Sequence, residues 1–493
     1  MTKPALALLL ALLVPAPAAD EVVAEDWYAQ FNHGKKVGWA HRRLLRTTVD
    51  GMPAWISESE SDAKPVRSTS RIVEDGDGRV LSYRTSVDIG MPKGPQVREG
   101  RIEKGVIHAV EDGKAREVPY PNGALGPAAV DRAIAKDLKP GAMGEVLAFQ
   151  PIDAKGGSMK WTVSAKTELT NVLGRYMWLT RVEKTDESGL PDISLVGAGG
   201  REYAGSNNLG MWQWYLAEEF VAKFDGETAA LLAPGILAPD RAIALSPKPT
   251  RGLYRLSRKG GGSITLPEGR WQKVVARGNA NPVDLEVTFA EPPSGTAIAR
   301  PQLGRKDLAR YLAAAPFLEL QHPRLQQFSA DVVGGLINSL RTARMIELAV
   351  HDYLKPAPAD VGFATACEVI SSETGDSTAA AALAAALCRA AGIPSRIVGG
   401  FAYQEGKTSG AFVLHVWVEA HIAEGVWFPL DPLRMDGTHP VKGVDDLEGH
   451  GGFDATHIAV IVSDLATDRP FTDIVKPVLD FMDGLTIRVI EPK

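Results

Sequence analysis

The stretch from Gly375 to Arg396 reads GDSTAAAALAAALCRAAGIPSR and contains the clearest helix signal of the chain. Its Ala- and Leu-rich centre, 379–391, has high helix propensity. Gly392 ends this helix as the residue after its last turn, and a proline follows two residues later. Asp376 or Ser377 can cap the first turn. We therefore expect Ser377 at a helix N-terminus, where the backbone dipole favours negative charge.

Three strand-like segments follow this helix: 397–403 (IVGGFAY), 412–419 (FVLHVWVE) and 426–432 (VWFPLDP). His415 lies inside the second segment, and Asp431 ends the third. Sixteen residues separate the two, which is enough for a hairpin that places them side by side. A nucleophile, a base and a residue that orients the base need to lie within hydrogen-bond reach of one another. The order Ser, His, Asp fits that requirement.

Four separated blocks in this region resemble the bacterial transglutaminase-like superfamily: GDST (375–378), AALCRAAGIPSR (385–396), HVWVE (415–419) and WFPLDP (427–432). The resemblance covers roughly residues 320–465. It implies a papain-like α+β fold and a Cys–His–Asp triad for acyl transfer or amide hydrolysis. Exported members of the family often carry a β-rich N-terminal region.

The chain departs from the family pattern at its nucleophile. The usual block is Gly-Asp-Cys-Thr-Glu-His-Ala, but this sequence has Ser377 in place of the Cys and Ala379 and Ala380 in place of the Glu and His. His415 and Asp431 stand on the matching positions. A thiol of pKa about 8.5 drops to roughly 3.5–7.5 at a helix N-terminus beside an imidazolium, so a Cys–His pair can rest ionised. A serine hydroxyl cannot, and it needs a general base during attack.

Two functions remain open for this region. We favour a catalytically degenerate transglutaminase-like domain that binds a protein or peptide, cell-wall peptide included, in the former active-site cleft. In that interpretation Ser377 is a helix N-cap without catalytic duty. The alternative is an active acyltransferase or amidase with a Ser377–His415–Asp431 triad. Neither chemistry requires a cofactor or a metal.

Other candidate residues carry weaker signals. His415, Glu419 and His421 alternate on one strand, but they lack a zinc-binding spacing. Cys367 and Cys388 fall in predicted helices and are expected to be inert core thiols.

A further pattern resembles the GDSL hydrolases, through GDS (375–377) and DATH (454–457). Only 80 residues separate Ser377 from His457, which is short for that fold, and the intermediate GxND block is absent. We therefore set this alternative aside.

We predict four segments. Residues 1–18 resemble a signal peptide, with Lys3, ten apolar residues and a small-x-small cleavage site near Ala18. Residues 22–245 form a β-rich antiparallel region, with a hairpin across 27–39 and a break into two subdomains near 119–125. Residues 246–300 form a small β module, and 301–493 form the transglutaminase-like domain with N-terminal helices, giving an α+β fold class.

Composition excludes several protein classes. The chain has 493 residues, 45% hydrophobic and 23% charged, which is typical of globular proteins. The net charge of −6 provides no electrostatic footprint for nucleic acid. The apolar run near the N-terminus is too short to span a bilayer. We therefore expect an exported, periplasmic or secreted protein without a transmembrane segment after signal cleavage. The sequence contains no indication of oligomeric state.

Overall fold

The structure is a computed structural model that describes residues 20–492, except 91, 93, 188, 208–209, 278–279, 293–294, 296, 407–409 and 436–450. The predicted signal peptide, 1–18, lies outside the described residues. The chain divides into two compact units. The first contains 20–166 and 181–216, and the second contains 167–180 and 217–492 of the described chain.

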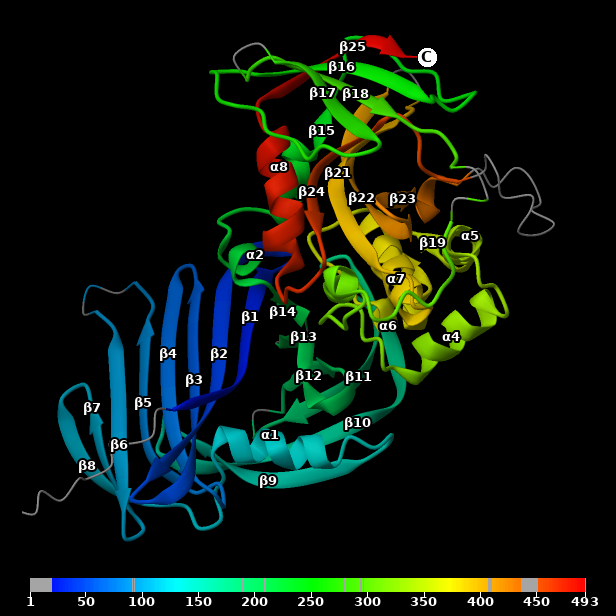
Figure 1. Cartoon of the computed structure of the whole chain (residues 1–493). Coiled ribbons are helices and arrows are strands. Elements are labelled where there is room, and N and C mark those ends of the chain that lie inside the picture. Colours follow the sequence, from blue (N-terminus) through cyan, green and yellow to red (C-terminus); the bar gives the residue numbers. More distant parts are fainter. Residues whose placement is uncertain are drawn as a thin grey trace, which may run out of the picture. The chain divides into compact units, whose positions relative to one another are not determined.

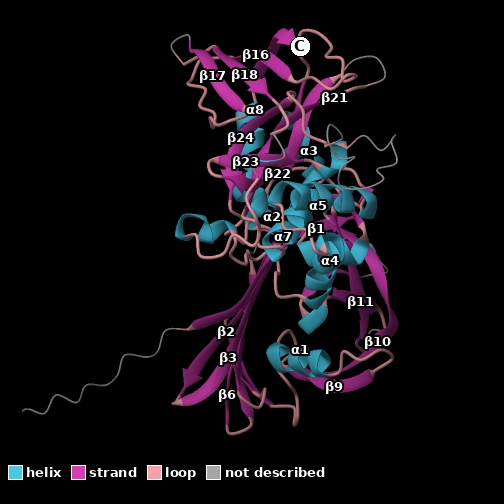
Figure 2. Ribbon diagram, turned by 45° about the vertical axis from the view of Figure 1, so that its right-hand side comes forward, coloured by secondary structure: helices cyan, strands magenta, loops and turns pink. Residues whose placement is uncertain are grey.

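The first unit is built on one large antiparallel sheet, drawn as the long strands of Figures 1 and 2. In the described part of the chain the sheet has fourteen strands, in the order β8-β7-β6-β5-β4-β3-β2-β1-β14-β13-β12-β11-β10-β9. The strands are β1 (Glu21–Asn32), β2 (Lys35–Val49), β3 (Met52–Ala63), β4 (Val66–Asp75), β5 (Val80–Asp88), β6 (Gln96–Glu103), β7 (Val106–Glu111), β8 (Lys114–Pro119), β9 (Met143–Gln150), β10 (Lys155–Val172), β11 (Arg175–Thr185), β12 (Pro191–Val196), β13 (Glu202–Asn207) and β14 (Trp212–Ala217).

The predicted hairpin is confirmed as β1–β2, which turns at His33 and Gly34. His33 and Gly34 have φ of 47° and 75°, the left-handed values that a tight turn between twisted strands requires. The chain leaves the sheet after β8 and forms helix α1 (Pro127–Lys136) before β9. Val130 and Ile134 of α1 are buried in one apolar cluster with Trp161 of β10. The predicted break near 119–125 thus coincides with this helical crossover, but both strand sets share one sheet.

The tip of the β10–β11 hairpin, 167–180, is part of the second unit. There Arg175 forms a two-pronged ion pair with Glu368, with Nη2–Oε1 and Nε–Oε2 distances of 2.5 and 3.2 Å. The indole N–H of Trp178 donates to the carbonyl of Ser371 at 2.7 Å. Both contacts are made to helix α6 (Ala366–Ser372), whose Thr365 and Glu368 form a capping box.

The second unit combines helices with small sheets. The main sheet has the order β15-β22-β21-β24, and β23 also pairs with β22. A second sheet, β17-β18-β16-β25, joins strands of the predicted 246–300 module to the C-terminal strand. The strands are β15 (Ile236–Leu237), β16 (Arg251–Arg258), β17 (Gln272–Arg277), β18 (Val283–Thr288), β19 (Lys355–Pro356), β20 (Thr374–Gly375), β21 (Ser395–Gln404), β22 (Ala411–Ala423), β23 (Val426–Leu430), β24 (His457–Ser463) and β25 (Leu485–Pro492).

The helices of this unit gather around its main sheet (Figure 2). Besides α6 they are α2 (Glu219–Lys223), α3 (Thr228–Leu232), α4 (Pro323–Val333), α5 (Ser339–Tyr353), α7 (Ser377–Ala390) and α8 (Lys476–Met482). Short 3-10 turns occur at η1 (Ala198–Gly200) in the first unit and at η3 (Ala233–Gly235), η5 (Lys306–Tyr311) and η6 (Pro432–Arg434), and a π-turn at η8 (Phe471–Val475). The N-terminal helices predicted for 301–493 include α4 and α5, and α4 ends at Gly334, which takes a φ of 48°.

Helix α7 is the centre of this unit and packs on β22 and β21 (Figure 1). Its Ala and Leu side chains are buried in the largest apolar cluster, with Leu383 and Leu387 fully buried. The predicted C-terminal glycine is confirmed, since Gly392 has a φ of 75° and donates to the Arg389 carbonyl at 2.9 Å. A helix buried on nearly all sides has its N-terminus held in one place, and that end carries Ser377.

Candidate functional site

The first turn of α7 presents Ser377 to a cleft. The cap is Asp376, whose Oδ1 accepts hydrogen bonds from the N–H groups of Thr378 (2.9 Å) and Ala379 (3.2 Å). Ser377 is the first residue of the helix and is half-buried. Gly375 before the cap must lack a side chain, because an added Cβ would lie 2.3 Å from the Cβ of Ala379. Of the two predicted caps, the structure selects Asp376, so capping does not occupy the Ser377 hydroxyl.

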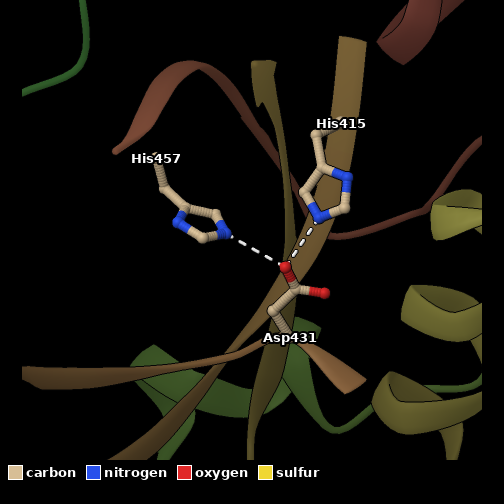
Figure 3. Close-up of side chains that lie close together, drawn as sticks. All are labelled: His415, Asp431 and His457. Atoms are coloured by element: carbon tan, nitrogen blue, oxygen red, sulfur yellow. Dashed lines mark hydrogen bonds and ion pairs between the residues drawn. The ribbon is translucent and has the colours of Figure 1, made fainter. Parts of the chain in front are cut away.

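His415 and Asp431 are brought together as predicted. Strands β22 and β23 pair antiparallel, with Val418 opposite Leu430, so Asp431, the residue after β23, lies close to the part of β22 that contains His415. The ring Nε2 of His415 lies 2.7 Å from Oδ2 of Asp431. Figure 3 shows this contact and the approach of His457 to the same oxygen. His415 is 7% exposed and Asp431 is 1% exposed, so the pair is largely shielded from water.

Ser377 and His415 line the same cleft, which has a volume of about 970 Å³. Within the described residues, neither the Ser377 hydroxyl nor Nδ1 of His415 forms a hydrogen bond, and none joins the two side chains. Asp431 holds Nε2, so Nδ1 is the nitrogen left for a substrate or a nucleophile. Apolar side chains supply much of the cleft wall: Leu232, Ile236, Leu245, Pro247, Pro356, Pro358, Val413, Leu414 and Leu433.

Asp431 is held ionised by its neighbours. Burial alone would raise the pKa of this carboxyl, but the charges and hydrogen bonds of His415 and His457 hold the pKa far below its usual range. The guanidinium of Arg434 lies 3.9 Å away from Oδ2. The backbone N–H of Asp431 donates to Oε1 of Glu347 on α5 at 2.8 Å. The carboxylate is therefore fixed in charge and in position.

His457 is the site residue that sequence reasoning missed. Its Nε2 lies 3.0 Å from Oδ2 of Asp431, and its Nδ1 lies 3.1 Å from Oδ1 of Asp454. Asp454 and His457 were noted above only for a different hydrolase pattern. Their local signal, Asp454-Ala-Thr-His457, is a turn in which Asp454 Oδ1 accepts from the Thr456 N–H at 2.8 Å. Nothing in that turn indicates that β24 brings it to Asp431.

The positions of Ala379 and Ala380 bear on the question of degeneracy. Both side chains are buried in the apolar cluster around α7, at 2% and 1% exposure, and neither lines the cleft. The two alanines therefore belong to the helix core and not to the cleft wall. Of the three positions 377, 379 and 380, Ser377 is the one that lines the cleft.

A metal-binding arrangement has to be weighed for this cluster. Among the described residues, one group could hold an ion: His415, Asp431 and His457, whose ligand atoms lie within 4.8 Å of one another. Each of these atoms is already engaged in a hydrogen bond to another member of the group, so we interpret the cluster as a charge-assisted network. The set weighed from sequence is dispersed, because Glu419 pairs with Arg396 and His421 pairs with Gln302.

The two cysteines are not bonded to each other. Cys388 is fully buried in α7, as predicted, and burial raises the pKa of its thiol to about 12. Cys367 is half-buried on α6, and burial and the neighbouring Glu319 raise the pKa of its thiol above the ordinary value. Neither thiol lines the cleft. A displaced thiol nucleophile is therefore not available at Ser377.

Comparison with known proteins gives a family match for part of the chain. Residues 326–432 match the model of the transglutaminase-like superfamily. No curated protein matches the sequence. In the described part of the chain, no helix combines the length and the apolar character needed to cross a membrane.

Several solved structures are similar to parts of this chain. A candidate cysteine protease from Cytophaga hutchinsonii is 13% identical over 48% of this chain and 83% of its own, with a TM-score of 0.28. A β-barrel-like protein of a domain of unknown function from Brucella abortus is 10% identical over 39% and 95%, with a TM-score of 0.26. The periplasmic domain of TgpA from Pseudomonas aeruginosa is 14% identical over 45% and 76%, with a TM-score of 0.24. The segment that matches the transglutaminase-like superfamily model, 326–432, includes α7, His415 and Asp431.

Proposed function

We propose that the transglutaminase-like domain is a serine-type acyltransferase or amidase that acts on peptide amides. Ser377 is the nucleophile, His415 is the general base and Asp431 orients His415. The observation that carries this proposal is the 2.7 Å His415–Asp431 pair, which lines one cleft with Ser377 and leaves Nδ1 of His415 without a partner among the described residues. The sequence left two functions open. This arrangement supports the active acyltransferase or amidase over the catalytically degenerate domain.

The proposed reaction has two steps. In the first, Ser377 Oγ attacks the amide carbonyl while His415 Nδ1 takes its proton, and the same nitrogen then protonates the departing amine. In the second, water or an acceptor amine attacks the acyl-serine and restores the hydroxyl. The N–H groups of Thr378 and Ala379 already donate to Asp376. The N–H of Ser377 is therefore the donor at the start of α7 that remains for the oxyanion.

A second candidate function is retention of a bound peptide without turnover. The observation that favours it is the missing hydrogen bond between the Ser377 hydroxyl and His415 among the described residues. A serine that does not contact its base before substrate arrives has no resting ion pair to activate it. The cleft with its apolar wall would then bind an extended peptide of a partner protein.

We also propose that the chain is exported, on the basis of its leader sequence.

Labelling with a fluorophosphonate distinguishes the two candidates. We expect covalent labelling of the wild-type protein at Ser377, read by intact mass and peptide mapping. Ser377→Ala and His415→Ala should abolish it, and Ser371→Ala, on α6, is the matched control that should label like wild type. In Ser377→Cys, rapid alkylation by iodoacetamide combined with no labelling of the wild type would overturn the enzymatic proposal and favour the binding cleft.

A further inference from the structure

A second histidine lies behind the proposed catalytic pair. His457 begins β24, and its side chain is fully buried between the rings of Phe453 and Trp417, with ring centroids 4.5 and 5.4 Å away. It contacts Asp431 on one side and Asp454 on the other. His457 does not reach the cleft that contains Ser377. His457 can therefore act on the chemistry only through its contacts with Asp431 and Asp454 and through its charge.

The hydrogen bonds around His457 define its charge. Both histidines direct Nε2 at Oδ2 of Asp431, so both nitrogens carry a proton. Nδ1 of His457 lies 3.1 Å from Oδ1 and from the carbonyl oxygen of Asp454, so it also faces acceptors. The N–H of Asp454 lies 3.3 Å away from Nδ1 and is the weaker contact. Burial lowers the pKa of His457, but its hydrogen bonds to the two carboxylates outweigh burial and raise the pKa overall.

The charged side chains that contact Asp431 and His457 balance one another. Two carboxylates, Asp431 and Asp454, are balanced by two cations, the imidazolium of His457 and the guanidinium of Arg434, which lies 3.9 and 3.7 Å from them. These four side chains therefore balance in charge among themselves.

Other charged and titratable groups lie close to the network, among them Asp376 at the start of α7, which lines the cleft with His415 and interacts with it electrostatically. Glu347 on α5 accepts the N–H of Asp431 and forms an ion pair with Arg344 at 2.7 Å. Arg344 also contacts Glu291. Tyr254 on β16 donates its hydroxyl to the carbonyl of Ala455 at 2.8 Å. None of these groups replaces His457 as the cation between Asp431 and Asp454.

We propose that His457 is a positioning residue of this site, which holds Asp431 against His415 and offsets its negative charge. Asp454, His457, Asp431 and His415 then form one chain of alternating acceptors and donors that ends at the cleft. A serine nucleophile needs an unprotonated base at the moment of attack, whereas a cysteine nucleophile gains from an imidazolium. The inference rests on the proposed function, and it explains how a Ser can stand at a position that the family fills with Cys.

The test is the pH dependence of fluorophosphonate labelling in His457→Gln. Glutamine keeps an N–H donor near Asp431 but has no charge. We expect the acid limb of the profile to move to higher pH by about 1–2 units, the effect of removing one unit charge roughly 6 Å from His415 in a partly buried site. The two rings are 5.7 Å apart. His457→Leu removes both the N–H donor and the positive charge, so it should also lower the labelling rate on the plateau of the profile. His457→Gln keeps the donor and should retain the wild-type plateau rate.

The matched control is His421→Gln, a buried histidine of β22 that bonds to Gln302 and does not face Asp431. It should leave the profile in place. A His457→Gln profile that superimposes on the wild type overturns the inference. If the wild type is not labelled at all, the proposed function fails. The role of His457 is then tested by measuring the pH dependence of iodoacetamide alkylation in Ser377→Cys. There, adding His457→Gln should shift the pH at which the thiol becomes reactive to iodoacetamide, and no shift would overturn the inference.

Discussion

Replacement of Asp454 by Asn removes the second carboxylate of the network, the one that contacts Nδ1 of His457. Asp454 is 2% exposed, and its Oδ1 accepts the N–H of Thr456 at 2.8 Å, a bond that the Asn carbonyl can retain. Burial would raise the pKa of the carboxyl, but the hydrogen bond and charge of His457, together with Arg434, lower it from 3.8 to about 2. The substitution therefore removes a charge while it keeps the shape.

The magnitude follows from that pKa. Lowering the pKa from 3.8 to about 2 corresponds to roughly 2 kcal/mol of stabilisation at neutral pH. Because the folded-state pKa is lowered, the stabilisation is present above the unfolded value and is lost as pH falls through the folded value. We expect Asp454→Asn to reduce the free energy of unfolding by about 2 kcal/mol at pH 7 and by only about 1 kcal/mol at pH 3.

Urea denaturation at pH 7, 5, 4 and 3 measures how the loss in free energy of unfolding changes with pH. Asp468→Asn, at an 86% exposed side chain, is the control and should change the free energy of unfolding by less than about 0.5 kcal/mol. A loss for Asp454→Asn that is the same at every pH would refute the electrostatic reasoning, since it would point to packing. No loss at pH 7 would refute it as well.

Three further predictions concern the site, the core and the leader. Asp431→Asn should reduce the labelling rate of Ser377 by about 10⁴-fold without loss of fold, the scale known for this substitution in a serine triad, and a rate within tenfold of wild type would contradict the role of Asp431. Leu387→Ala, at a fully buried position of α7, should cost about 2–5 kcal/mol in urea denaturation, whereas Leu303→Ala, at a 71% exposed position, should cost little. Mass spectrometry of the protein secreted by a bacterial host should show an N-terminus near residue 19, and an intact Met1 in that fraction would contradict the signal peptide.

Local pattern was sufficient to predict the elements that carry the triad positions. The Ala- and Leu-rich run predicted α7 because propensity and a glycine stop agree there. The alternation around His415 predicted β22, and its distance from Asp431 predicted the pairing of β22 with β23. The residues that make these contacts are close in sequence or lie on the two strands of one hairpin.

The remaining features depend on contacts between distant segments. β24 brings His457 to Asp431 across 26 residues, and its own sequence resembles any apolar strand with a capping turn. In the first unit, β1 pairs with β2 as predicted, but its other neighbour is β14, at the far end of the sheet-forming sequence. Strand order of this kind is set by which faces bury one another, and periodicity describes only one strand at a time.

The two contacts that the β10–β11 tip makes with α6 determine which fragments of this protein keep the second unit intact. Because Arg175 and Trp178 hold α6 from a position earlier in the chain than the rest of the second unit, no single cut yields that unit whole. A shortened chain that starts at residue 217 would leave the Glu368 carboxylate without its guanidinium and the Ser371 carbonyl without its indole donor. The second unit is thus discontinuous in sequence, and its behaviour is best studied in the whole chain or in a shortened chain with the hairpin tip supplied in trans.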